Sequence, residues 1–225
     1  VLAGGSGERV GMSGCAGFLS CPVCGQRLAD AGASLVCPKR HTFDRARAGY
    51  VDLLPPGHGR SGIRGDTAEM LRARRRFLER GHYQPLAGAI AEAAVRHLAD
   101  ASALRPGPEP DSDPSDAVAG RVAGPSRRPG STDTAAPVNR APIVLDVGCG
   151  EGYYLGHVMR RVMAAAGGGC FYGLDVSRDA VRMAARAHRN GLFFIGDVKR
   201  RICLADGSAD LLLNVFAPRN GTEFA

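Results

Sequence analysis

The sequence is poor in several features that define other protein classes. It has no tryptophan, aromatic residues make up 6% of the chain, and Lys39 and Lys199 are its only lysines. No run of about 18 apolar residues is present, so we expect no membrane-spanning helix and no membrane partner. The opening stretch lacks a basic start followed by an apolar block, so we expect no secretory signal and a cytoplasmic location.

The residues that are present indicate a globular protein with an anionic partner. The chain has 225 residues, of which 44% are hydrophobic and 23% are charged, and this length suits one ordinary domain and a small one. Its formal net charge of +7 favours nucleic acid as a partner. Seven cysteines without a secretion signal indicate metal ligands or reduced thiols and not a disulfide framework.

Composition divides the chain into successive zones. We expect a flexible leader at residues 1–18, a metal-stapled module at 19–54 and a helical connector at 65–104. Residues 105–142 hold eight of the 14 prolines and no aromatic residue, which predicts a disordered linker because too little apolar surface is available for burial.

The connector shows the periodicity of two helices. Asp66 or Thr67 can cap the first, and the second is predicted from Pro85 to Leu98. The apolar face expected on the second helix consists of Leu86, Ile90, Ala94, Val95 and Leu98. A run of arginines on the first helix is either its solvated side or an RNA contact, and both interpretations stay open.

Four residues have the spacing of zinc ligands. Cys21, Cys24, Cys37 and His41 form C-x2-C-x12-C-x3-H, which predicts one structural zinc in a ribbon, because two tight turns together complete a tetrahedral shell. The competing interpretation is a redox C-x-x-C with the other two ligands incidental. The remaining cysteines have no partner at ligand spacing and are expected to be small apolar filler: Cys15, Cys149, Cys170 and Cys203.

From residue 143 onward, buried strands alternate with helices. Apolar runs near 143–147, 170–176, 192–198 and 211–216 are separated by helical stretches ending near Ala166 and His188. This alternation predicts an α/β fold with a doubly wound parallel sheet.

The first of these strands leads into a glycine-rich loop. Gly148, Gly150 and Gly152 lie between a strand and a helix, where a backbone approaches a ligand closely. Acids mark the ends of three successive strands: Asp146, Asp175 and Asp197. An acid at the second strand end suits ribose hydroxyls, so the set favours S-adenosylmethionine over a nicotinamide dinucleotide; the alternative is that Asp175 and Asp197 are ordinary strand-end acids.

Together these segments resemble the bacterial 23S rRNA guanine-N1 methyltransferases, a group that includes enzymes conferring resistance to macrolides such as tylosin and mycinamicin. The matching text comprises CPVCG at Cys21, CPKRHTFDRARAGYVDLL from Cys37, GDTAEMLRARRRFLERGHYQPL from Gly65, VLDVGCGEGYY from Val144, YGLDVS from Tyr172 and LLLNVFAPRN ending at Asn220. The resemblance implies a Rossmann-like class I S-adenosylmethionine-dependent methyltransferase with an N-terminal zinc ribbon that recognises RNA.

The resemblance also implies zinc at the four ligands named above and cofactor contacts from Tyr83, Gly150 and Glu151. It implies methylation of guanine N1 in 23S ribosomal RNA, and a homodimer is the assembly we consider. No catalytic side chain can be named, although residues 214–218 are expected to wall the substrate pocket.

Only four of the family's seven strands fit into residues 143–216, in the spatial order 3-2-1-4, so we expect a truncated domain of low activity with an exposed fourth strand. Two alternatives remain: a small-molecule methyltransferase, and a zinc-ribbon RNA-binding protein with an inactive methyltransferase half.

Overall fold

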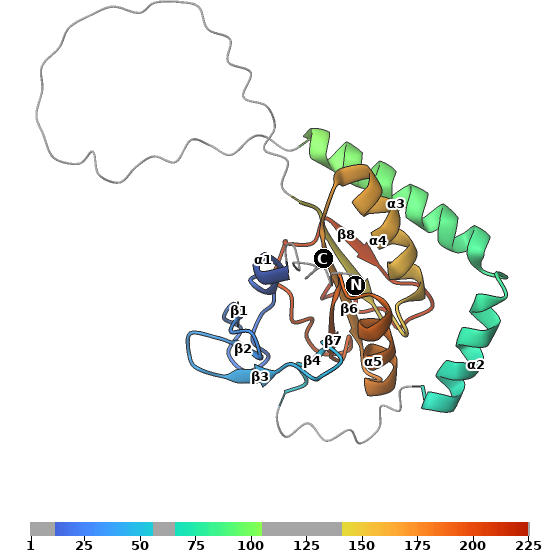
Figure 1. The fold of residues 1–225 in the computed structure, drawn as a ribbon. Coiled ribbons are helices and arrows are strands. Elements are labelled where there is room, and N and C mark those ends of the chain that lie inside the picture. The colour runs from blue at the N-terminus through green and yellow to red at the C-terminus, as the bar shows by residue number, and fades with distance from the viewer. Residues whose placement is uncertain (1–11, 56–65, 105–140, 225) are drawn as a thin grey trace, which may run out of the picture.

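The computed structural model describes residues 12–55, 66–104 and 141–224, which contain two sheets (Figure 1). The larger sheet consists of β4 (Val51–Asp52), β5 (Ile143–Val147), β6 (Cys170–Asp175), β7 (Leu192–Ile195) and β8 (Leu211–Leu213). Its strands are all parallel and lie in the order β4-β7-β6-β5-β8. The predicted order of the four later strands is therefore confirmed.

One face of this sheet is covered by helices. The helices α4 (Tyr153–Ala166) and α5 (Arg178–Ala187) connect successive strands, as the sequence predicts. The helix α3 (Gln84–Leu104) lies alongside α4, and α2 (Ala68–Glu79) contacts α5 (Figure 1). Because side chains alternate along a strand, Val144, Phe171 and Phe193 point into this helical layer.

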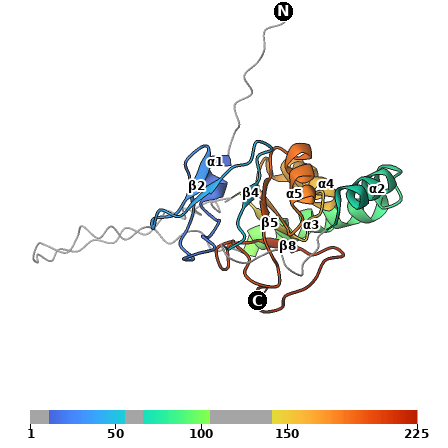
Figure 2. The same cartoon turned by 90° about the horizontal axis from the view of Figure 1, so that it is seen from below.

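The opposite face is covered by the N-terminal module. It comprises α1 (Met12–Ala16) and an antiparallel sheet of β1 (Ala29–Asp30), β2 (Ser34–Val36) and β3 (Thr42–Asp44). Figure 2 shows this module and the helices on opposite sides of the large sheet. The alternate strand residues, including Leu145, Tyr172 and Phe194, share one core with Leu19 and Leu35 of the module.

The predicted leader at residues 1–18 is wrong where the structure describes it. Ala16 is fully buried, and a disulfide joins Cys15 to Cys170 at the start of β6. The prediction that these two cysteines are unpaired filler is wrong for the same reason. Burial of the α1 segment against the large sheet brings the two thiols together, which no sequence spacing reveals; residues 1–11 lie outside the described part.

A second correction concerns the end of the N-terminal module. Residues 50–54 are predicted as part of the ribbon, but Val51 pairs with Phe194, so that β4 becomes the edge strand of the large sheet. The parallel pairing covers the outer edge of β7 and buries Val51 and Leu53 completely or nearly so. The ribbon and the large sheet therefore form one folding unit.

The helical connector begins where the sequence predicts. Thr67 caps α2, its side chain accepting a hydrogen bond from the Met70 N–H at 3.3 Å, and the helix ends before Gly81, whose φ is +82°. The buried face of α3 agrees with the prediction except at one residue: Ala94 is buried, the partly buried Ile90, Val95 and Leu98 pack against the core, but Leu86 is 39% exposed. Ala87 and Ala91 are buried in addition, and these small side chains allow α3 to approach α4 closely.

Two further predictions are limited by the described range. The predicted linker lies outside the described residues except at 141 and 142, which lead directly into β5. Within the residues that the structure describes, no helix combines the length and the apolar character needed to cross a membrane.

Candidate functional site

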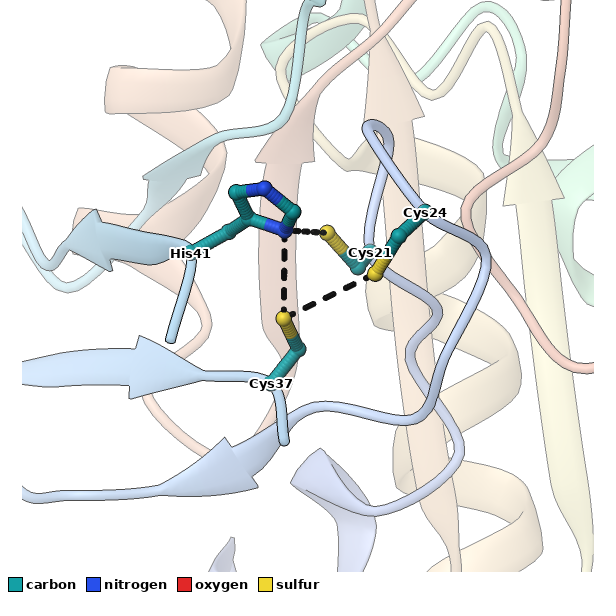
Figure 3. Close-up of side chains that lie close together, drawn as sticks. All are labelled: Cys21, Cys24, Cys37 and His41. Atoms are coloured by element: carbon teal, nitrogen blue, oxygen red, sulfur yellow. Dashed lines mark hydrogen bonds between the residues drawn. The ribbon is translucent and has the colours of Figure 1, made fainter. Parts of the chain in front are cut away.

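The four predicted metal ligands converge on one point (Figure 3). Their ligand atoms all lie within 4.8 Å of one another. The His41 Nδ1 is 3.6 Å from the Cys21 Sγ and 3.3 Å from the Cys37 Sγ, while the Cys24 and Cys37 sulfurs are 3.7 Å apart. Ligand atoms placed about 2.0–2.3 Å from a tetrahedral zinc lie about 3.3–3.8 Å from one another, so the donor set and these three separations fit zinc.

Two tight turns shape this cluster. In the first, the Gly25 N–H donates to the Cys21 carbonyl at 2.9 Å and Gly25 has a φ of +74°. In the second, the Arg40 N–H donates to the Cys37 carbonyl at 2.8 Å and Arg40 has a φ of +64°. Four protein ligands leave no position for a catalytic water, so the site is structural in type and not a redox pair.

The electrostatics of the cluster favour a thiolate at Cys37. Desolvation raises the pKa of this thiol, but the His41 backbone N–H, the Cys24 thiol and the His41 ring together outweigh it and lower the pKa to about 7. Desolvation dominates at Cys21 and raises the pKa of its thiol. A thiol that ionises near neutral pH is suited to a metal ligand.

The predicted glycine loop links β5 to α4. Gly148, Gly150 and Gly152 have φ values of +75°, +56° and +80°, a region that favours glycine. A Cβ on Gly148 would overlap the Cβ of Ala217, in the loop after β8. A Cβ on Gly152 would lie 2.8 Å from the His188 ring. The absence of side chains therefore lets neighbouring segments close around the loop.

Asp175 connects the end of β6 to this loop. Its Oδ2 accepts a hydrogen bond from the Gly150 N–H at 2.9 Å, and its Oδ1 accepts one from the Ser177 N–H at 2.8 Å. Desolvation raises the pKa of Asp175, while these two N–H groups oppose the shift. Each carboxylate oxygen keeps a lone pair for a further donor, as a ribose hydroxyl requires.

Asp146 lies beneath the loop. Its side chain is 2% exposed, and burial followed by the nearby charge of Asp175 raises the pKa of Asp146 to about 7. The backbone N–H of Leu155 in α4 partly offsets this shift. Such burial leaves Asp146 little surface for a ligand, and its predicted cofactor contact stays a prediction.

Glu151 pairs with an arginine of the run whose role the sequence leaves open. The Arg75 Nε donates to the Glu151 Oε2 at 2.7 Å, and Glu151 is 5% exposed. Desolvation raises the pKa of Glu151, and Arg75 opposes the rise. Arg74, one residue earlier, pairs with Asp66 at 2.6 Å and lies against Gly150. Two arginines of the run therefore contact the loop region, and only the helical periodicity of α2 hints at this.

The other two predicted cofactor residues lie after β7 and between α2 and α3. Asp197 follows β7, is 7% exposed, accepts from the Lys199 N–H at 3.0 Å and lies 3.4 Å from the Arg200 Nε. Tyr83 follows α2, and its ring centroid is 5.9 Å from that of Phe216, in the loop after β8. The structure thus places the predicted residues around the carboxyl ends of β5 to β8, where doubly wound folds bind ligands.

The strand order and the glycine loop are those of a Rossmann-like fold, and the family matches identify it as a class I methyltransferase fold joined to a zinc ribbon. Residues 144–221 match a methyltransferase domain model, and residues 19–62 match the RlmA N-terminal zinc-ribbon model. The chain is related along nine-tenths of its length to the 23S rRNA (guanine-N1)-methyltransferase group, which confirms the resemblance seen in the sequence.

Two relatives carry this relationship. A protein of Micromonospora griseorubida, provisionally named a 23S rRNA (guanine-N(1)-)-methyltransferase, is 43% identical over 210 residues, which are 92% of this chain and 60% of the relative. The 23S rRNA (guanine(748)-N(1))-methyltransferase of Streptomyces fradiae is 34% identical over 206 residues, which are 92% of this chain and 58% of the relative. The chain therefore spans about 60% of the length of these relatives.

Solved structures match a smaller part of the chain. A SAM dependent methyltransferase from Aquifex aeolicus is 27% identical, covers 32% of this chain and 39% of its own, and has a TM-score of 0.29. DesVI of Streptomyces venezuelae is 25% identical, covers 34% of this chain and 29% of its own, and has a TM-score of 0.27.

Proposed function

We propose that this chain binds S-adenosylmethionine and 23S ribosomal RNA and acts in methylation of guanine N1. The observation that carries the proposal is the packing of a Cys3His ribbon and a methyltransferase glycine loop into one unit. A small-molecule methyltransferase needs the glycine loop but no ribbon. The names of the two bacterial relatives support ribosomal RNA as the substrate.

The cofactor contacts that we propose surround the glycine loop. Gly148, Gly150 and Gly152 let the backbone approach the ligand, and Asp175 accepts hydrogen bonds from the ribose. Asp197, just after β7, and Tyr83, between α2 and α3, are the flanking contacts that we propose. Asp146 and Glu151 act from within the fold, because both carboxyl groups are buried and the second is paired with Arg75.

Bound S-adenosylmethionine supplies an electrophilic methyl group on a sulfonium. The chain then has to orient the acceptor nitrogen and exclude water, and few catalytic side chains are needed. Guanine N1 carries a proton at neutral pH and lies on the Watson–Crick edge, so the base must be unstacked and must lose that proton. We propose that the loop of residues 214–218 forms one wall of the pocket that receives it.

The ribbon is proposed as the RNA-recognition part, with zinc held by its three cysteines and His41. A metal there holds the two turns together and acts in folding, because four protein ligands close the shell. We further propose action in the cytoplasm. A homodimer and macrolide resistance stay predictions, to be checked by sedimentation and by the susceptibility of an expressing strain.

Methyl transfer to RNA is the direct test. The full chain is incubated with 23S rRNA fragments and labelled S-adenosylmethionine, and modified guanine is located by primer extension, because an N1-methyl group blocks base pairing. Asp175→Asn keeps the side-chain size but weakens the acceptor, and we expect cofactor affinity to fall by about 5-fold or more. Label found on small acceptors and not on RNA would contradict the RNA substrate.

A further inference from the structure

Phe216 is an exposed aromatic side chain on an unfavourable backbone. It is 78% exposed, the most exposed of the large hydrophobic residues in the described part of the chain, and its φ is +57°. A bulky residue rarely adopts a positive φ, and such residues persist only where the surrounding structure fixes them, often at functional sites. Neither burial nor local preference explains this ring.

The turn around Phe216 is fixed from two sides. The Asn214 Nδ2 donates to the Pro218 carbonyl at 3.0 Å and closes the turn. Ala217 packs into the space that the missing side chain of Gly148 leaves open. The Phe216 ring is therefore held beside the glycine loop, next to the proposed cofactor site.

Two tyrosines flank this ring. The Tyr83 centroid is 5.9 Å away with an interplanar angle of 89°, and the Tyr154 centroid is 6.2 Å away with an angle of 63°. Desolvation, followed by the neighbouring phenols Tyr83 and Tyr153, raises the pKa of Tyr154, so its hydroxyl stays protonated at neutral pH and can donate a hydrogen bond. Three chain segments thus bring aromatic rings to one place.

Arginines lie near this group, one of them in space and three in the sequence; Arg74, the one in space, also pairs with Asp66. Arg74 lies against Gly150 in the loop that Tyr154 follows, and Arg219 lies three residues after Phe216. Arg76, in α2, and Arg80, just after it, are exposed. Among the described residues, no ion pair involves these two arginines or Arg219. Aromatic faces among arginines match the chemistry of a nucleotide, whose base stacks while its phosphates pair with cations.

We propose that Phe216, flanked by Tyr83 and Tyr154, is the stacking platform for the unstacked purine base that receives the methyl group. This inference rests on the proposed function and names the residue that holds its substrate. The platform adjoins the glycine loop, so a base stacked there lies beside the methyl donor. Stacking is tolerant of sequence, which leaves recognition of the particular guanine to other contacts.

Fluorescence of 2-aminopurine tests the platform, because stacking quenches this base. The full chain is titrated with a short single-stranded oligouridine RNA carrying one 2-aminopurine, and with the same RNA carrying an abasic site. We expect quenching, and weaker binding of the abasic RNA. Phe216→Gly should abolish the quenching and weaken binding by about 5- to 150-fold, the range for loss of one base–aromatic stack. Phe216→Trp should retain both.

Phe216→Gly also separates binding from folding, because glycine adopts a φ of +57° freely. Its unfolding midpoint should be equal to or above that of the wild type. Met70→Ala removes another exposed apolar side chain, at 55% exposure, and should leave the quenching unchanged. Quenching that survives Phe216→Gly, or equal affinity for the abasic RNA, overturns the platform.

Calorimetry with S-adenosylmethionine distinguishes this inference from the proposed function. If the wild type binds the cofactor and Phe216→Gly binds RNA normally, the platform alone is wrong. If the wild type binds neither cofactor nor RNA, the proposed function fails and the platform fails with it.

Discussion

Arg75 and Glu151, 76 residues apart in the sequence, form a 2.7 Å charged hydrogen bond that fastens α2 to the glycine loop. Glu151 is 5% exposed, whereas Arg75 is 38% exposed at its side chain, so the pair joins a buried carboxylate to the surface of the connector helix. The arginine run is therefore neither wholly solvated nor wholly available to RNA. At least one of its members has a structural role at the proposed cofactor site.

Replacing Arg75 should destabilise the chain. Arg75→Met leaves Glu151 buried without its charged partner, and we expect the free energy of unfolding to fall by about 1–3 kcal/mol, a value kept low because Arg75 is partly exposed. Urea unfolding measures the change. Arg76→Met, on the exposed side of the same helix, is the matched control; equal losses in both variants would contradict a specific role for the pair.

Gly148 should tolerate no side chain. Gly148→Ala adds a Cβ that overlaps Ala217 and holds alanine at a φ of +75°, so we expect a loss of at least about 2 kcal/mol in stability and weaker cofactor binding. Gly168→Ala, which has nothing within 4 Å, is the control and should be near neutral. Thermal unfolding and calorimetry measure both; normal behaviour of Gly148→Ala would count against the close packing of these loops.

Asp146 should make stability depend on pH. Folding raises the pKa of Asp146 from 3.8 to about 7. The contribution of its protonated carboxyl to the free energy of unfolding is therefore fully present below pH 3.8 and is lost as the pH rises to about 7. Asp146→Asn lacks this titration. Above pH 7 the variant should be more stable than the wild type by a few kcal/mol, because each pKa unit between the folded and the unfolded chain corresponds to about 1.4 kcal/mol. Urea unfolding across pH 4–8 tests this, with exposed Asp206→Asn as control; parallel pH profiles would contradict it.

Zinc should stabilise the whole chain and not the ribbon alone. Because the ribbon and the large sheet share a core, Cys37→Ser or chelation should release one zinc per chain and lower the unfolding midpoint of the whole chain. Elemental analysis and circular dichroism measure the two effects. Cys149→Ala removes a thiol outside the cluster and should keep the zinc. A metal-free chain that unfolds as the zinc-loaded chain does would refute this prediction.

The Cys15–Cys170 disulfide should contribute through chain entropy. It closes a loop with a sequence separation of 155, for which the entropic model gives about 5 kcal/mol. Reduction with a phosphine should therefore lower the unfolding midpoint of the wild type. The same treatment should have no further effect on Cys15→Ser, and identical midpoints before and after reduction of the wild type would contradict the bond.

Local patterns in the sequence determined much of this protein. The metal ligands are predicted because each pair lies within one turn, and the parallel sheet is predicted from buried apolar runs separated by helices, whereas the strand order is what the family resemblance implies. Thr67 is predicted as a cap because capping involves residues only three apart. Each of these predictions starts from residues that are close in sequence: two ligands of one turn, a cap and its first helical turn, or one apolar run.

Tertiary structure alone decided the contacts between distant segments. The joining of β4 to β7, the Arg75–Glu151 pair and the disulfide connect parts of the chain that carry no local sign of one another. The same holds for Asp146, whose carboxyl is buried by the helix that packs above it. Burial and long-range pairing depend on how whole layers stack, and the position of Phe216 depends on the packing of its neighbour Ala217 against Gly148.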